Sequence, residues 1–186
     1  KVLRADGQTI GISRGYLIYD ESDQLEAIKE VLKKLNISPR ETKPHSIAWA
    51  ISGAKNELLS PLEYGQYARG YFQENVTRVY VGYQKLLKEI DALDFDDLIM
   101  ETVRLWQKEP TIWDKYREKY KYVLVDEYQD TNRAQYQLTK MLASKWKNLT
   151  VVGDASQAIY GWRGANYRNL LNLKADFPDL TTINLE

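Results

Sequence analysis

Apolar residues in the first half of the chain recur at the three- and four-residue spacing of amphipathic helices. Over 24–35 one stripe is formed by Leu25, Ile28, Val31, Leu32 and Leu35. Asp20 to Ser22 precede this stripe as a helix cap. The same spacing predicts further helices over 46–58, over 75–91, and from Asp94 to the break at Glu109-Pro110. Residues 1–13 are expected to be the end of a helix followed by a loop.

The second half has a different pattern, in which short apolar runs flank one helical segment. Residues 122–125 and 149–152 have strand character, and 131–145 between them have helical spacing. The positions of this helical segment that we expect to face inward are Tyr136, Leu138, Met141, Leu142 and Trp146. This order predicts two parallel strands, adjacent or nearly so, whose following loops share one sheet edge. We also expect a third strand at 181–185. The predicted fold class is α/β, with a parallel sheet preceded by an all-helical part that ends near residue 92.

Two adjacent carboxylates, Asp126 and Glu127, end the first apolar run. At the carboxyl edge of a parallel sheet, one carboxylate can hold a hydrated Mg²⁺ bound to nucleotide phosphates. Its neighbour can orient or deprotonate a water for attack on the terminal phosphate. Gln129 then lies where its amide could sense that phosphate. A solvated acidic turn is the alternative interpretation, because strand ends often carry Asp and Glu.

Several segments together resemble the UvrD/PcrA/Rep-type superfamily-one DNA helicases, and within them the PcrA-like type. Residues 125–132, Val-Asp-Glu-Tyr-Gln-Asp-Thr-Asn, resemble motif II of that family, and 153–165, Gly-Asp-Ala-Ser-Gln-Ala-Ile-Tyr-Gly-Trp-Arg-Gly-Ala, resemble motif III. Residues 94–98 match a short acidic motif ahead of motif II, and 183–186 match the strand that opens motif IV. Residues 16–24 are similar to the start of the family's inserted helical subdomain.

The resemblance implies a partial RecA-like (P-loop NTPase) lobe with its inserted subdomain. It divides the chain into a helical inserted subdomain with its lead-in (1–92) and a partial RecA-like ATPase core with motifs II and III (93–186). The implied function is that of an ATP-dependent 3′–5′ DNA helicase. Such an enzyme couples ATP hydrolysis to single-strand translocation and duplex unwinding in DNA repair or replication. The implied cofactors are ATP and Mg²⁺, and the implied partners are single-stranded and duplex DNA.

The family's site roles fall on six positions of this sequence. Asp126 is the expected Mg²⁺ ligand and nucleotide contact, and Glu127 positions the hydrolytic water. The resemblance places Gln157 and Arg163 at the nucleotide, with catalytic and cofactor-binding roles, and it places Tyr160 and Trp162 on single-stranded DNA. The alternatives are a loop-capping amide for Gln157, a surface salt bridge for Arg163 and packing in an interface for Tyr160 and Trp162.

The chain departs from the family pattern inside motif III. Ser156 stands where Asp is common, and Ala158 stands where Ser is common. The first change removes a negative charge and the second removes a hydroxyl, so we expect altered coupling rather than loss of function.

Three carboxylates near the middle of the chain, Asp94, Asp96 and Asp97, have two interpretations. They could be a metal cluster, but capping of the following helix is favoured, because carboxylates at a helix start satisfy free amides and the macrodipole. Asp154 is either a neighbour of the metal site or a turn cap. His45, the single histidine, has no partner in the sequence and is assigned no chemistry.

Composition changes this picture little. The 186 residues are 44% hydrophobic and 28% charged with a formal net charge of zero, which indicates a globular protein without an overall basic field. The absence of cysteine excludes disulfides and thiolate metal sites. No apolar run approaches the roughly 20 residues that span a bilayer, so we expect no membrane association. The resemblance implies a bacterial protein, and we expect a cytoplasmic location.

The nucleotide-binding string G-x-x-x-x-G-K-[ST] does not occur in the sequence, and Gly53-Ala-Lys55 lacks its other elements. We therefore expect an excised piece of a helicase that is inactive by itself. The alternatives are a subunit of a RecB/AddA-type helicase–nuclease and a non-catalytic nucleic-acid or protein interaction module. The helical half is a possible docking site for protein partners.

Overall fold

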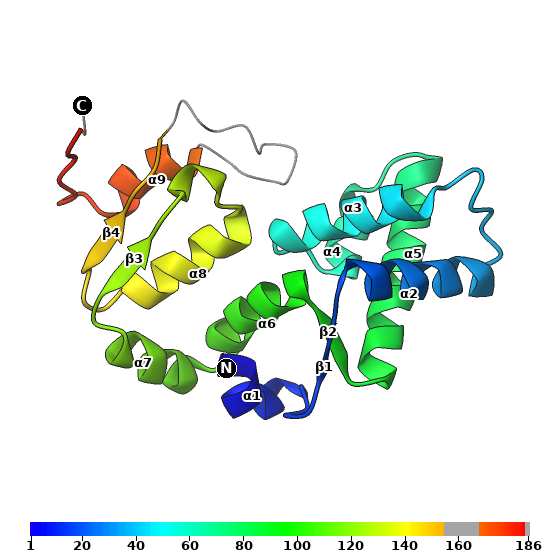
Figure 1. Cartoon of the computed structure of the whole chain (residues 1–186), viewed down its shortest axis with the longest axis horizontal. Helices are drawn as coiled ribbons and strands as arrows, with labels where there is room; N and C mark the ends of the chain where they lie inside the picture. Colours follow the sequence, from blue (N-terminus) through cyan, green and yellow to red (C-terminus); the bar gives the residue numbers. More distant parts are fainter. Residues whose placement is uncertain (155–167, 185–186) are drawn as a thin grey trace. The chain divides into compact units, whose positions relative to one another are not determined.

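The computed structural model describes residues 1–154 and 168–184, and these residues form two compact units, 1–112 and 113–186. The first unit contains α1 (Val2–Asp6), η1 (Gly7–Ile10), β1 (Leu17–Tyr19), α2 (Glu21–Lys34), α3 (Pro44–Asn56), α4 (Pro61–Tyr67), α5 (Tyr71–Glu89), β2 (Ala92–Asp94) and α6 (Phe95–Lys108). α7 (Pro110–Lys119) begins in this unit and continues into the second, which adds β3 (Val123–Val125), η2 (Tyr128–Asp130), α8 (Arg133–Ala143), β4 (Leu149–Val151) and α9 (Arg168–Asp176) (Figure 1).

Local capping explains where most of the helices begin. Asp20, Ser60, Asp94 and Asn132 each accept a bond from the backbone three residues on, and the side chain at that third position bonds back. Such reciprocal capping boxes satisfy amides that the helix itself leaves unpaired. Proline at the first turn of α3 and α4 has the same effect, since it has no amide to satisfy. The predicted helices and the capping role of Asp94 are confirmed.

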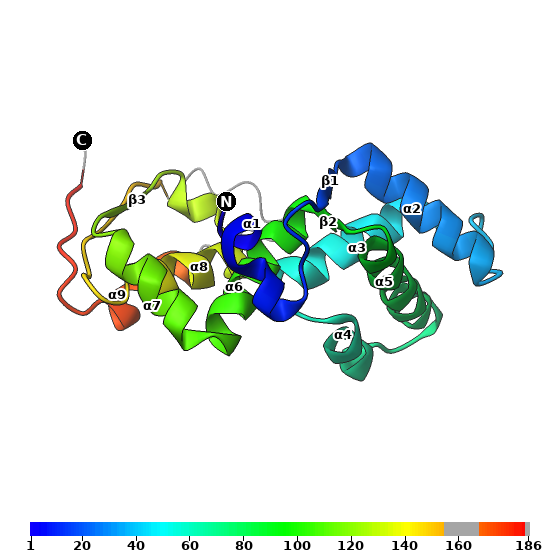
Figure 2. The same ribbon diagram turned by 90° about the horizontal axis from the view of Figure 1, so that it is seen from below.

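The core of the first unit lies where α2, α3 and α5 pack together (Figure 2). Ile28, Ile47, Ile51, Val79 and Tyr80 are among its fully buried side chains. Gly82 lets α5 approach α2 closely, because a Cβ there would lie 2.7 Å from Val31 Cγ1. The apolar stripes predicted from the sequence therefore meet at this core.

The expectation that the first half is entirely helical is wrong. β1 and β2 pair in parallel, with Leu17 opposite Ala92 and Tyr19 opposite Asp94. α2 to α5 thus form one long connection between two neighbouring strands. Because both strands have three residues and lie more than 70 positions apart, neither has a periodicity that reveals it.

The carboxylate of Asp94, at the end of β2, joins three helices of the first unit. Its Oδ2 accepts bonds from Lys55 Nζ at 2.6 Å, Tyr83 Oη at 2.9 Å and Gln24 Nε2 at 3.2 Å. Lys55 also faces Asp97 Oδ1 at 2.8 Å, and its side chain is fully buried. Burial raises the pKa of Asp97 to about 6. Burial acts in the same direction on Asp94, but Lys55 outweighs it and holds the pKa of that carboxyl below its usual range.

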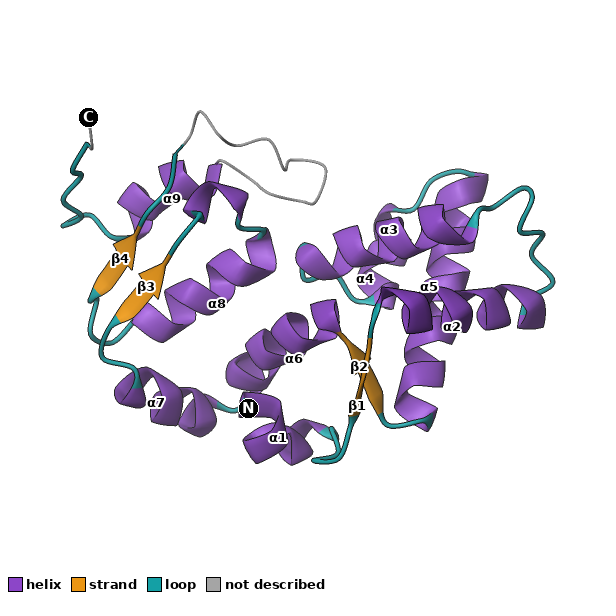
Figure 3. Cartoon of the chain, in the orientation of Figure 1, coloured by secondary structure: helices purple, strands orange, loops and turns teal. Residues whose placement is uncertain are grey.

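In the second unit β3 and β4 pair in parallel, with Val123 opposite Leu149 and Val125 opposite Val151 (Figure 3). Tyr128, Tyr136 and Leu173 form the core, against Val125, Leu149, Val151, Phe177 and Leu180. Lys140 Nζ lies 2.6 Å from Asp176 Oδ1, which ties α8 to α9. The adjacent parallel strands joined by a helix are confirmed, as is the mixed α/β class.

Three further details differ from the expectations. Residues 181–184 form no strand, since no neighbouring strand pairs with them in the described part of the chain. Trp146 lies beyond the end of α8 and is exposed rather than inward. The compact units divide after residue 112 rather than at 92, while the assignment of 1–92 and 93–186 to a helical subdomain and an ATPase core stays a prediction.

We predict that Lys55→Met destabilises the chain by about 3–5 kcal/mol, because it leaves two buried carboxylates without their cation. The urea midpoint, followed by circular dichroism, measures this change. Lys29→Met is the matched control, since its ion pair with Glu26 is exposed and is worth about 0–1 kcal/mol. A Lys55→Met midpoint as close to wild type as that of the control would contradict the prediction.

Candidate nucleotide site

The acidic pair lies where the sequence places it, directly after β3. Asp126 and Glu127 are both exposed, and they precede the short helix η2. Asp126 Oδ1 accepts the backbone N–H of Glu127 at 2.9 Å, which fixes the orientation of the first carboxylate. The pair is therefore presented to solvent at the carboxyl end of a parallel strand, where open α/β sheets bind ligands.

The backbone at Glu127 has a left-handed conformation, with φ 49° and ψ 43°. Residues other than glycine, asparagine and aspartate rarely adopt it, and the cost is on the order of 1–3 kcal/mol. The surrounding hydrogen bonds hold this turn in place. Tyr128 N donates to Val152 O at 2.9 Å, and Val152 N donates to Val125 O at 2.9 Å. The ladder between β3 and β4 thus continues past the acidic pair.

Gln129 joins the two loops that follow β3 and β4. Its Nε2 donates to Glu127 Oε2 at 2.7 Å, and its Oε1 accepts the backbone N–H of Asp154 at 3.0 Å. The residue is only 1% exposed. The expectation that Gln129 could sense phosphate stays a prediction, and in the structure its amide bonds to both loops. It positions Glu127 relative to the start of the second loop.

Gly153 leaves the room that this amide requires. A Cβ at position 153 would lie 2.7 Å from Gln129 Oε1 and 3.3 Å from Gln129 N. Gly153 and Asp154, which follow the second strand, are therefore part of the same contact with Gln129. The backbone N–H of Asp154 faces Gln129, and the exposed position of this residue agrees with a place at the sheet edge.

Four predicted site residues, Gln157, Tyr160, Trp162 and Arg163, lie outside the described residues, as do Ser156 and Ala158. Their roles stay predictions. At the start of the loop after β4, Gly153 and Asp154 lie beside the side-chain amide of Gln129. Within residues 1–154 and 168–184, no helix has the length and apolar character needed to cross a membrane.

Within the described residues, the chemistry of this edge comes from its carboxylates. Asp126 and Glu127 supply two exposed carboxylates, while no group of three or more His, Asp or Glu in the described residues could cage a metal. Asp94 and Asp97, the other acidic candidates, face Lys55 instead. Two exposed carboxylates are the kind of oxygen ligands by which a hydrated Mg²⁺ is held together with substrate phosphates.

Sequence comparison relates nearly all of the chain to one family. The profile described as the UvrD/REP helicase N-terminal domain matches residues 1–178. The protein named ATP-dependent DNA helicase PcrA of Staphylococcus aureus is 49% identical over 186 residues, and proteins of that name from Bacillus subtilis and Staphylococcus epidermidis are 48% identical over the same length. Each match covers all of this chain but only 25–26% of the relative.

We predict that Gly153→Ala destabilises the chain by about 1–3 kcal/mol, because the added methyl group displaces the buried Gln129 amide. Gly53→Ala in α3 is the control, since a Cβ there meets no atom within 4 Å and alanine favours a helix interior by about 0.5–1 kcal/mol. Urea unfolding should therefore shift the two midpoints in opposite directions. Equal shifts of the same sign would contradict this view of Gly153.

Proposed function

Because this chain belongs to the UvrD/REP helicase N-terminal domain family, we propose that it supplies part of the nucleotide-hydrolysing core of an ATP-dependent DNA helicase. The chain spans about a quarter of the length of the relatives named above, so the activity belongs to a longer protein. The observation that carries the proposal is the exposed acidic pair after β3, held by Gln129 against the start of the loop after β4.

In this proposal Asp126 holds hydrated Mg²⁺ on the phosphates of ATP, and Glu127 orients the attacking water. The metal neutralises charge on the phosphates when it is bound. Gln129 fixes one oxygen of the Glu127 carboxylate, which leaves the other to face the water. A positioned carboxylate contributes typically about 100- to 10,000-fold to such a reaction.

Gln157 and Arg163 complete the nucleotide site in the proposal, and Tyr160 and Trp162 contact single-stranded DNA. Their support is the resemblance of residues 153–165 to motif III. Hydrolysis at the nucleotide is then coupled, through this segment, to 3′–5′ movement along the DNA strand that Tyr160 and Trp162 contact. Duplex unwinding in DNA repair or replication follows as the function of the longer protein.

The 186-residue chain is proposed to be inactive by itself. Its sequence contains no G-x-x-x-x-G-K-[ST] string, and in nucleotide hydrolases of this class the amides and lysine of that string hold the β- and γ-phosphates. The relatives' names favour a helicase over the helicase–nuclease and non-catalytic alternatives. A bacterial cytoplasmic location and protein partners on the helical half remain predictions.

We predict that ATP turnover distinguishes the chain from the longer protein. The isolated chain should show no DNA-stimulated phosphate release, while the longer protein should show it and lose at least about 100-fold on Glu127→Gln. Asp179→Asn, an exposed carboxylate in the same unit, is the control and should leave the rate unchanged.

Two outcomes would contradict the proposed function. One is turnover by the isolated chain that Glu127→Gln abolishes, since the missing phosphate-binding string would then be dispensable. The other is a longer protein whose DNA-stimulated turnover survives Glu127→Gln.

A further inference from the structure

A basic and aromatic surface lies at the opposite edge of the β3–β4 sheet, where the two strands begin. The segments 113–122 and 144–148 lead into these strands. Together they carry six basic residues against two acidic ones, in a chain of zero formal net charge: Lys115, Arg117, Lys119, Lys121, Lys145 and Lys147 against Asp114 and Glu118. We call the exposed part of it, formed by 119–122 and 145–147, the start-edge surface.

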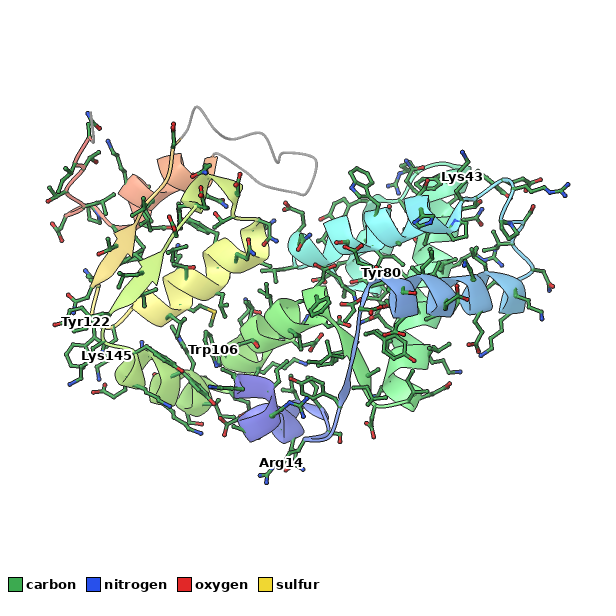
Figure 4. The ribbon with its side chains drawn as sticks, viewed as in Figure 1. Arg14, Lys43, Tyr80, Trp106, Tyr122 and Lys145 are labelled. Atoms are coloured by element: carbon green, nitrogen blue, oxygen red, sulfur yellow. The ribbon has the colours of Figure 1, made fainter. Side chains whose placement is uncertain are left out.

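Hydrogen bonds hold the two segments of the start-edge surface side by side. Asn148 Nδ2 donates to Lys121 O at 3.0 Å, and Trp146 Nε1 donates to Glu118 O at 3.2 Å. Lys145 forms an ion pair with Glu118. Figure 4 labels Tyr122 and Lys145, which belong to these two segments. The surface is therefore fixed by contacts within the second unit.

Aromatic rings and ammonium groups alternate on this surface. The indole ring of Trp146 has Lys121 Nζ at 5.3 Å and Lys145 Nζ at 5.4 Å from its centroid, and Lys119 Nζ lies 5.6 Å from that of Tyr120. Tyr122 is 74% exposed. Tyr and Trp side chains combine an apolar ring with a polar edge, which suits a surface that meets a partner.

A single nucleic-acid strand carries groups that bind both the lysines and the aromatic rings of this surface. Its phosphates attract the ammonium groups, and its unpaired bases stack on aromatic rings with a gain of about 1–3 kcal/mol per base. An acidic peptide would use the charges, but its carboxylates would not stack on the rings. The interleaving of rings and charges therefore favours single-stranded nucleic acid.

We propose that the start-edge surface binds single-stranded nucleic acid, with Tyr122 and Trp146 stacking on bases and Lys119, Lys121 and Lys147 contacting phosphates. This site goes beyond the proposed function, because Asp126, Glu127 and the loop after β4 lie at the carboxyl ends of the same strands. A nucleic-acid strand bound here would contact the β3–β4 sheet at the edge opposite the candidate nucleotide site.

Binding of a fluorescein-labelled 20-residue oligothymidylate to the 186-residue chain, followed by anisotropy, tests the proposal. Lys119→Gln/Lys121→Gln should weaken binding at least fivefold and reduce the slope of log affinity against log salt by about 1.4, as expected for two lost phosphate contacts. The control Lys33→Gln/Lys34→Gln removes the same charge from α2 and should change affinity less than twofold.

The stacking part of the proposal has its own matched pair of variants. Tyr122→Ala should weaken binding at least fivefold, whereas Tyr67→Ala, which removes a ring that is 73% exposed in the first unit, should not. Circular dichroism of each variant checks that the fold is unchanged. No binding by the wild-type chain, or equal binding by the start-edge variants, would overturn the proposal.

Cross-linking locates the bound strand and separates this inference from the proposed function. An oligonucleotide that contains 5-bromodeoxyuridine should cross-link to Tyr120, Tyr122 or Trp146, and Trp162→Ala should leave those cross-links intact. Cross-links confined to residues 155–167 would overturn the start-edge site and still support the motif III contact. Displacement by polyglutamate as effective as that by unlabelled oligothymidylate would also overturn it, in favour of an acidic protein partner.

Discussion

Parallel pairing of short strands is the constraint on which both units depend, because it determines where each strand's terminal carboxylate goes. β2 ends in Asp94 and β3 is followed by Asp126 and Glu127. In the first unit the carboxylate is buried and faces Lys55. In the second the two carboxylates are exposed. The same placement at a strand end thus gives a structural anchor in one unit and a candidate reactive edge in the other.

Helix caps and apolar stripes made much of this fold predictable from the sequence. The strand–helix–strand order also predicted the β3–β4 pair, since a crossover of that length permits few arrangements. The β1–β2 pair was not predictable, because three-residue strands that meet across a four-helix connection leave no local signal. The expected strand at 181–185 is not formed, because residues 181–184 have no partner strand among the described residues.

The residue types of the candidate site were predictable from the sequence, but the hydrogen bonds that hold them in place were less so. The acidic pair is apparent from the sequence, whereas the role of Gln129 depends on a residue 25 positions away. Lys55 shows the same limit. A lysine in the last turn of an amphipathic helix is expected to be solvated, and only the fold shows that Asp94 and Asp97 converge on it. In both cases the missing information is a long-range contact between polar groups, which neither composition nor periodicity carries.

In the function we propose, Gln129 connects the two loops of the site through hydrogen bonds and does not only fill space. Its amide holds Glu127 through one atom and the backbone of Asp154 through the other, so movement of either loop changes the hydrogen bonds of the other. Gly153 keeps the space between them open. An arrangement of this kind links the position of a catalytic carboxylate to the path of the loop that we assign to DNA.

The left-handed backbone at Glu127 also sets a conflict between folding and chemistry. Glycine would adopt this conformation without the steric cost that glutamate pays, but it would remove the carboxylate that faces solvent. A selection that rewards only yield or heat resistance therefore favours glycine or asparagine at this turn. Variants enriched in that way would be more stable but would lack the Glu127 carboxylate that we propose orients the water.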